Sequence, residues 1–198
     1  MARVFRFLPS CAVFAALCGC SLLPVPPERS TVYHDIGFPK NVLELPRPVV
    51  VTRFDGDVGD RAKMCFRVAG NTIKPDAFNR WSQPPASLLR RYLTLALRGS
   101  GGDVPATDAK AGLIEIGGEL IRFDGDLDSK TATLCVLVVA STPGRRLVER
   151  KTFFREVFTV TAPFDGKTAS SFAEAMGEAS SKLAKEIASR LGKAHGGG

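Results

Sequence analysis

The chain has 198 residues, of which 44% are hydrophobic and 24% are charged, and its formal net charge is +7. This composition excludes a disordered or collagen-like chain and is typical of one folded domain with a packed core. The basic residues do not form one long run. They indicate a solvated basic surface or contact with anionic lipid head groups, and we expect no nucleic-acid partner.

The start of the chain has the pattern of a secretory signal peptide. Arg3 and Arg6 give it a basic beginning, and an apolar run of about ten residues follows, about half of what a membrane-spanning helix needs. The run ends in Leu-Cys-Gly-Cys at 17–20, which resembles the lipobox of bacterial lipoproteins. The resemblance implies a signal peptide at 1–19 that is removed, followed by acylation of Cys20.

Two alternatives remain for this N-terminal segment: a secretory signal in which Cys20 occurs by chance, or an arm that is not removed. In lipoproteins of Gram-negative type, Ser21 after the acylated Cys20 implies sorting to the outer membrane, with the domain facing the periplasm. Residues 20–31 contain three prolines, Pro24, Pro26 and Pro27. They are expected to form an extended tether.

In the first half of the domain, apolar and β-branched runs bounded by Gly, Pro and Asp predict strands. We expect these strands at 32–38, 48–54 and 63–69, with an ambiguous segment at 72–81. A helix is expected at 86–97, because apolar residues recur there at helical spacing after two prolines.

In the second half, strands are expected at 113–123, 131–140 and 147–161. The pair Gly117-Gly118 predicts a bulge in the first of them. The second is apolar on both faces, which predicts a central strand covered on both sides. An amphipathic helix is expected at 169–191, and we expect it to end at Gly192 before a disordered tail at 193–198.

The sequence Arg-Phe-Asp-Gly-Asp occurs at 53–57 and again at 122–126. The further oxygen ligands of a calcium loop are absent, so ordinary turn chemistry is favoured over metal binding. The carboxylates stand at expected turns without a basic orienting partner. The repeat indicates an α+β fold with two halves, each made of strands and then a helix. We expect a mixed or antiparallel sheet with both helices packed on it over 32–192.

No residues suggest catalysis or a cofactor. The histidines, His34 and His195, stand near the tether and in the tail, and no nucleophile elbow, phosphate loop or HExxH motif occurs. Outside the signal and Cys20, the cysteines are Cys65 and Cys135. Each lies in an apolar run, so they form either a disulfide or two separate buried thiols. No spacing suggests a metal site.

Three features are candidates for contact with lipid or a partner. Trp81 is either an aromatic contact or a residue that packs a loop onto the helix start. A basic hairpin is formed by Arg145, Arg146, Arg150, Lys151 and Arg155. It either meets phospholipid head groups or an acidic partner, or forms a soluble rim. Phe153 points away from Phe154 and Phe158, so one side belongs to the core. The other side either belongs to the core as well or forms an exposed apolar patch.

The order of elements and several short segments resemble the family of ABC-type transport auxiliary lipoproteins. The segments are Tyr33, Met64–Arg67, Arg80–Pro85 with its Trp-x-x-Pro-Pro pattern, Ile121–Phe123 and Val148–Phe153. The resemblance implies a non-catalytic lipoprotein that docks the periplasmic MCE-domain subunit of an ABC transporter. Such a system moves lipids or other apolar solutes between membranes. The lipoprotein would then contact phospholipid, and several copies of it could form a ring. The rival interpretations are an envelope scaffold unconnected to transport and an exported hydrolase.

Overall fold

The computed structural model describes residues 30–45, 47–56, 62–70, 72–98, 113–144 and 150–196. The expected signal peptide, the acylated Cys20 and most of the tether lie outside these residues. The elements belong to one unit that spans Thr31–Gly198. In chain order they are β1 (Val32–His34), β2 (Val49–Asp55), β3 (Lys63–Val68), β4 (Thr72–Trp81), α1 (Pro85–Ala96), β5 (Ile114–Asp126), β6 (Thr131–Ser141), β7 (Thr152–Pro163) and α2 (Ala169–Gly196).

These strands form one mixed sheet in the order β1-β4-β3-β5-β6-β7, with β2 also paired to β5. The strands β5, β6 and β7 form a long antiparallel meander. On the other side of β5, β2 runs parallel to its first half and β3 runs parallel to its last two residues. Thus β2 and β3 lie one after the other along a single edge of β5.

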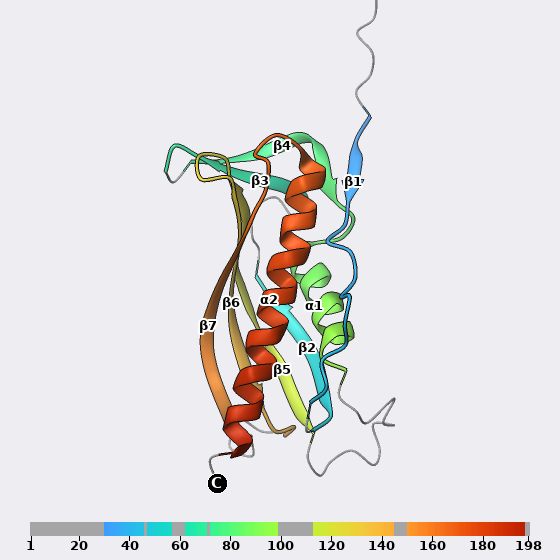
Figure 1. Ribbon diagram of the computed structural model, residues 1–198, viewed down its shortest axis with the longest axis vertical. Coiled ribbons are helices and arrows are strands. Elements are labelled where there is room, and N and C mark those ends of the chain that lie inside the picture. The colour runs from blue at the N-terminus through green and yellow to red at the C-terminus, as the bar shows by residue number, and fades with distance from the viewer. Residues whose placement is uncertain are drawn as a thin grey trace, which may run out of the picture. The chain divides into compact units, whose positions relative to one another are not determined.

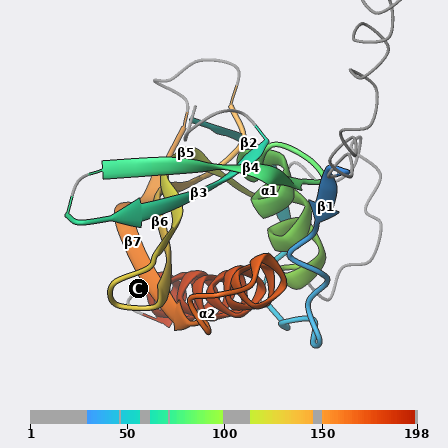
Figure 2. The same ribbon diagram turned by 90° about the horizontal axis from the view of Figure 1, so that it is seen from above.

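Both helices pack on the same face of the sheet (Figures 1 and 2), α1 over β2 and α2 over β6 and β7. Alternate residues of β6 face these helices and are fully buried: Ala132, Leu134, Val136, Val138 and Ala140. The α+β fold with a mixed sheet and two helices is therefore confirmed. Each half also has the expected order, because β2-β3-β4-α1 is followed by β5-β6-β7-α2.

Aromatic rings fill the core between the β3–β4 ribbon and the first half of α2. Phe172 of α2 is in ring contact with Trp81, Phe66 and Phe164, with centroid distances of 5.4, 4.9 and 5.5 Å. Gly125 lies beneath these rings, and a Cβ there would come within 3.0–3.2 Å of three of them. The glycine of the second repeat copy therefore makes room for the core.

The segment 72–81, which the sequence left ambiguous, is a strand of ten residues. In the β5–β6 ladder the bulge lies at Ile121, between Leu120 and Arg122, whereas the β2–β5 ladder shifts register at the glycine pair, with the extra residue on β2 between Val51 and Phe54. Other local expectations were wrong. The strand expected at 113–123 does not give way to a turn at 124–126, because β5 runs through Asp126. The helix α2 continues past Gly192 to Gly196, so residues 193–196 of the expected tail are helical.

The expectation that β6 is covered on both faces was also wrong. Cys135, Leu137 and Val139 point away from the helices and are half-buried. No described element packs over them. Beside them, Ile121 and Val157 are 49% and 53% exposed. We call these five residues the outer apolar face.

Candidate functional site

A strap of residues 35–45 leads from β1 across both helices. Near its start, Ile36 is buried, and its carbonyl lies against Gly177 of α2, where a Cβ would overlap it. Near its end, the Leu43 amide donates to the Ala96 carbonyl of α1 at 2.8 Å. Between these two attachments the strap rises from the surface, and Phe38 is 69% exposed.

Hydrogen bonds to Asp35 fix the start of the strap. The Asp35 carboxylate accepts hydrogen bonds from the Arg91 guanidinium at 2.5 Å, the Ser82 hydroxyl at 2.7 Å and the Gly37 amide at 2.8 Å. Burial alone raises the pKa of Asp35, but these hydrogen bonds outweigh it and hold the pKa below its usual value. The charged carboxylate therefore ties the strap to α1 at neutral pH.

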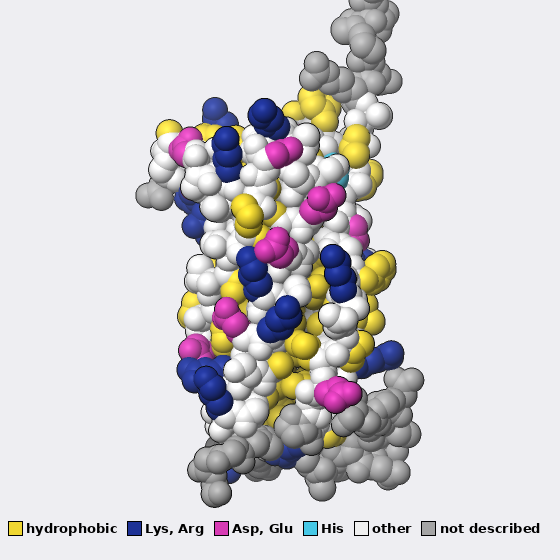
Figure 3. All heavy atoms as spheres, in the orientation of Figure 1, with side chains coloured by type: hydrophobic (Ala, Val, Ile, Leu, Met, Phe, Trp, Pro, Cys, Tyr) yellow, Lys and Arg dark blue, Asp and Glu magenta, His cyan; other side chains and the backbone are white. Residues whose placement is uncertain are grey.

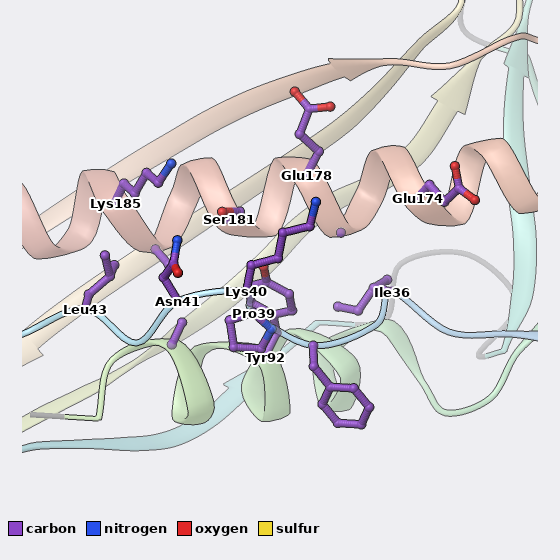
Figure 4. A pocket seen from close by; sticks show the side chains of 14 residues that line it. Ile36, Pro39, Lys40, Asn41, Leu43, Tyr92, Glu174, Glu178, Ser181 and Lys185 are labelled. Atoms are coloured by element: carbon purple, nitrogen blue, oxygen red, sulfur yellow. The ribbon is translucent and has the colours of Figure 1, made fainter.

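A cavity of about 550 Å³ lies between the strap and the two helices. Its floor is apolar and buried, and consists of Ile36, Tyr92, Ala96 and Ala184. Its rim carries the exposed charges of Lys40, Glu174, Glu178 and Lys185. We call this cavity the strap groove. Figure 4 shows Lys40 extending from the strap toward α2, while Glu178 points away from the strap.

The surface around α2 has charges of both signs with hydrophobic side chains visible between them (Figure 3). Glu178 is paired with Lys182 one turn later at 2.7 Å, and Glu156 of β7 accepts two hydrogen bonds from Arg190. This face therefore has balanced charge, and the apolar floor of the strap groove is its most distinctive chemical feature.

Trp81 lies in the core and not at the surface. Its side chain is 1% exposed, and its ring meets Phe123 edge-on at 5.2 Å as well as Phe172. The following residue joins the loop to β1, because the Ser82 amide donates to the His34 carbonyl at 2.7 Å. Trp81 therefore packs the loop onto the domain, and it cannot touch a partner in this conformation.

The basic hairpin is only partly described, since Arg145 and Arg146 lie outside the described residues. Arg150 donates to the Gly144 carbonyl at 3.0 Å and lies 3.6 Å from the carboxylate of Glu115 on β5. Lys151 and Arg155 are exposed. These two residues offer their cations on the surface, whereas Arg150 is engaged within the domain.

Phe153 does not form an exposed patch. It is half-buried against the core, as is Phe154, and the guanidinium of Arg47 lies 5.5 Å from its ring centroid. The ladder shifts register between Ala140 and Ser141, which leaves Phe153 as the extra residue of a bulge. Strict alternation placed Phe153 and Phe154 on opposite sides, and this bulge explains why that prediction fails.

The two cysteines are separate thiols rather than a disulfide. Cys65 lies on β3 and Cys135 on β6, with β5 between these strands. The Cys65 thiol donates to the carbonyl of Lys63 at 3.6 Å, and the Thr159 hydroxyl donates to the Cys135 sulfur at 3.3 Å. The disulfide alternative is therefore not realised in this structure.

The sequence interpretation missed a buried charge cluster at the second copy of the repeat. The Asp124 side chain is 7% exposed and lies between two guanidinium groups, those of Arg122 at 2.8 Å and Arg67 at 3.2 Å. The expectation that these carboxylates lack a basic partner was thus wrong for Asp124. Part of the cluster could have been found from the sequence. Side chains alternate along a strand, so Arg122 and Asp124 lie on the same face, away from the core.

Within the described ranges, no group of three or more His, Cys, Asp or Glu side chains could hold a metal ion. No helix in that part of the chain combines the length and the apolar character that crossing a membrane requires.

Two solved structures share the fold. An uncharacterised protein aligns with a TM-score of 0.62 and 10% identity, over 82% of this chain and 99% of its own. Protein XCC0632 from Xanthomonas campestris, assigned to the family DUF330, aligns with a TM-score of 0.54 and 14% identity, over 80% of this chain and 90% of its own. No curated protein matches the sequence.

The sequence itself matches a family over most of the folded domain. Residues 56–188 match the family described as ABC-type transport auxiliary lipoprotein component. The match begins at the end of β2 and extends into the last turns of α2. It contains the aromatic core, the Asp124 cluster, all of α1 and most of α2. The chain therefore belongs to the family of ABC-type transport auxiliary lipoprotein components.

Proposed function

We propose that this protein is a non-catalytic subunit, anchored to the outer membrane through acylated Cys20, that docks the periplasmic MCE-domain subunit of an ABC transporter. The family match over 56–188 carries the proposal, because it supports a role in ABC-type transport. The lipobox-like sequence at 17–20 agrees with the lipoprotein part of the family description. The transported molecules would be lipids or other apolar solutes, and ATP hydrolysis would belong to another subunit.

The outer apolar face supports a docking role. Exposed apolar side chains that lie together on a protein surface commonly mark a contact with another protein. Leu137 is paired with Val157 across the ladder, and Ile121 protrudes from the bulge in β5. Glu119 and Arg155 are exposed on the same sheet and would form a polar rim around the contact.

A photo-crosslinking amino acid at Val157, in the full-length lipoprotein in its own cells, tests this proposal. We expect a crosslink to an MCE-domain subunit encoded with a permease and an ATPase. The same amino acid at Val42 is the matched control, because Val42 is a valine of similar exposure, 57% against 53%, on the strap. If neither position crosslinks to a transporter subunit, the protein is a structural or assembly lipoprotein instead.

A further inference from the structure

We infer that the strap groove binds a single acyl chain, with the polar end of the amphiphile left at the charged rim. This inference deepens the proposed function, and it rests on that function only for the source of the chain. The outer apolar face and the strap groove are different surfaces, so docking and acyl-chain binding are separable.

The dimensions of the groove suit one chain. Its volume of about 550 Å³ lies within the 300–1,000 Å³ that small-molecule pockets occupy. The residues of α2 that line it run from Glu174 to Lys185, which at about 1.5 Å per residue is a length of about 16 Å. A cavity that extends this far along a helix accepts an extended chain better than a compact ring system.

The distribution of polar groups sets the ligand class. Ile36, Ala96 and Ala184 of the floor are each at most 5% exposed, and a polar group buried against these three side chains would lose its hydrogen bonds to water without replacement. Asn41 and Ser181 supply the uncharged polar part of the lining. All four charged side chains of the lining, by contrast, are exposed at the rim. A ligand that fits must therefore have an apolar body and a polar end that stays in water.

The strap provides the cover for such a chain. Its two attachments, at Gly177 and at the Ala96 carbonyl, hold the ends of the arch. Phe38 between them borders the cavity although most of its side chain is exposed. The guanidinium of Arg91 lies 5.2 Å from the centroid of this ring and holds it at the edge of the arch.

The test is photolabelling of the full-length lipoprotein in nanodiscs with a fatty acid that carries a diazirine in mid-chain. We expect the label in peptides from the strap or from 174–185, and at least a tenfold loss of labelling with excess palmitate or lysophosphatidylethanolamine. If only palmitate competes, the groove binds a free fatty acid. If only the lysolipid competes, the groove binds the acyl chain of a phospholipid. Glycerophosphoethanolamine, a head group without a chain, should not compete.

Ser181→Trp places a large side chain in the groove, because Ser181 lines it and is half-buried. We expect labelling to fall about tenfold. Ser189→Trp makes the same change at an exposed residue of α2 that does not line the groove, and labelling should stay unchanged. Should Ser181→Trp fail to fold, Lys185→Trp at the exposed rim serves as a second variant, and we expect it to reduce labelling about threefold.

Labelling spread over other peptides, competition by the head group alone, or a folded Ser181→Trp protein that labels like the wild type would each overturn the inference. Crosslinking from Val157 is measured in the same variants. A preserved crosslink with no label in the groove refutes acyl-chain binding alone, whereas a label in the groove with no crosslink refutes the docking function alone.

Discussion

Replacing Asp124 by Asn should destabilise the domain far more than the equivalent change in the first copy of the repeat. The substitution keeps the size of the side chain but removes its charge and one acceptor oxygen from between Arg122 and Arg67. Both arginine side chains are themselves mostly buried, with exposures of 30% and 19%. They would be left as two neighbouring cations without their shared carboxylate.

The expected loss follows from the exposures. Breaking a fully buried ion pair from one side costs about 3–5 kcal/mol, and the partial exposure of the arginines lowers this to about 2–3 kcal/mol. The matched control is Asp55→Asn, because the Asp55–Arg53 pair has side chains that are 65% and 84% exposed. Surface pairs contribute about 0–1 kcal/mol, so this change should be nearly neutral.

Urea unfolding of a non-acylated form, made with Cys20→Ser, measures both variants. With a slope of about 2 kcal/mol per M urea, Asp124→Asn should lower the midpoint by about 1–1.5 M. Asp55→Asn should lower it by less than about 0.5 M. Equal midpoints for the two variants would show that the buried cluster does not stabilise the fold and would refute this reasoning.

Two further predictions concern α2. Gly177→Ala should lower the melting temperature, because the new Cβ overlaps the Ile36 carbonyl and overpacking costs about 1–3 kcal/mol. The control is Gly192→Ala, where a Cβ would meet nothing within 4 Å, and this change should stabilise the fold by up to about 1 kcal/mol. Equal effects of the two substitutions in thermal unfolding would contradict the close contact at Gly177. Hydrogen bonds from Ser171, and then from the Thr168 and Lys167 amides, lower the pKa of Asp165, so its stabilisation is complete above the unfolded value of about 3.9 and is lost as the pH falls below it. In the Asp165→Asn variant the melting temperature should therefore depend less on pH between about pH 4 and pH 2. A melting temperature that falls with pH as steeply as in the wild type would exclude this role of Asp165.

The helices and most strands could be predicted because their signals are local. In α1, Leu88, Leu89 and Tyr92 recur at helical spacing after two prolines, and all three are buried. The segment 72–81 gave no clear signal, because it contains Lys74, Pro75 and Asp76. Its strand conformation depends on hydrogen bonds from β1 and β3 on either side, which no local pattern reveals.

The candidate site could not be predicted for the same physical reason. Pro39, Pro46 and Pro48 indicate a loop at 39–48, and nothing in the sequence connects Ile36 with Gly177 far along the chain. The position of Trp81 in the core agrees with one of the two interpretations considered, since its neighbouring prolines fix the loop. The arginines around Asp124 come from two different strands, and only the parallel pairing of β3 with β5 brings Arg67 to it.

The shared edge of β5 has a consequence for how this duplicated architecture holds together. Both β2 and β3 of the first half take their parallel partner from the second half. Dividing the chain between the halves would leave β2 without any partner strand and one edge of β5 unpaired. Despite the repetition of its parts, the protein is therefore expected to melt in a single cooperative step, and fragments cut at the α1–β5 connection should regain structure only when mixed.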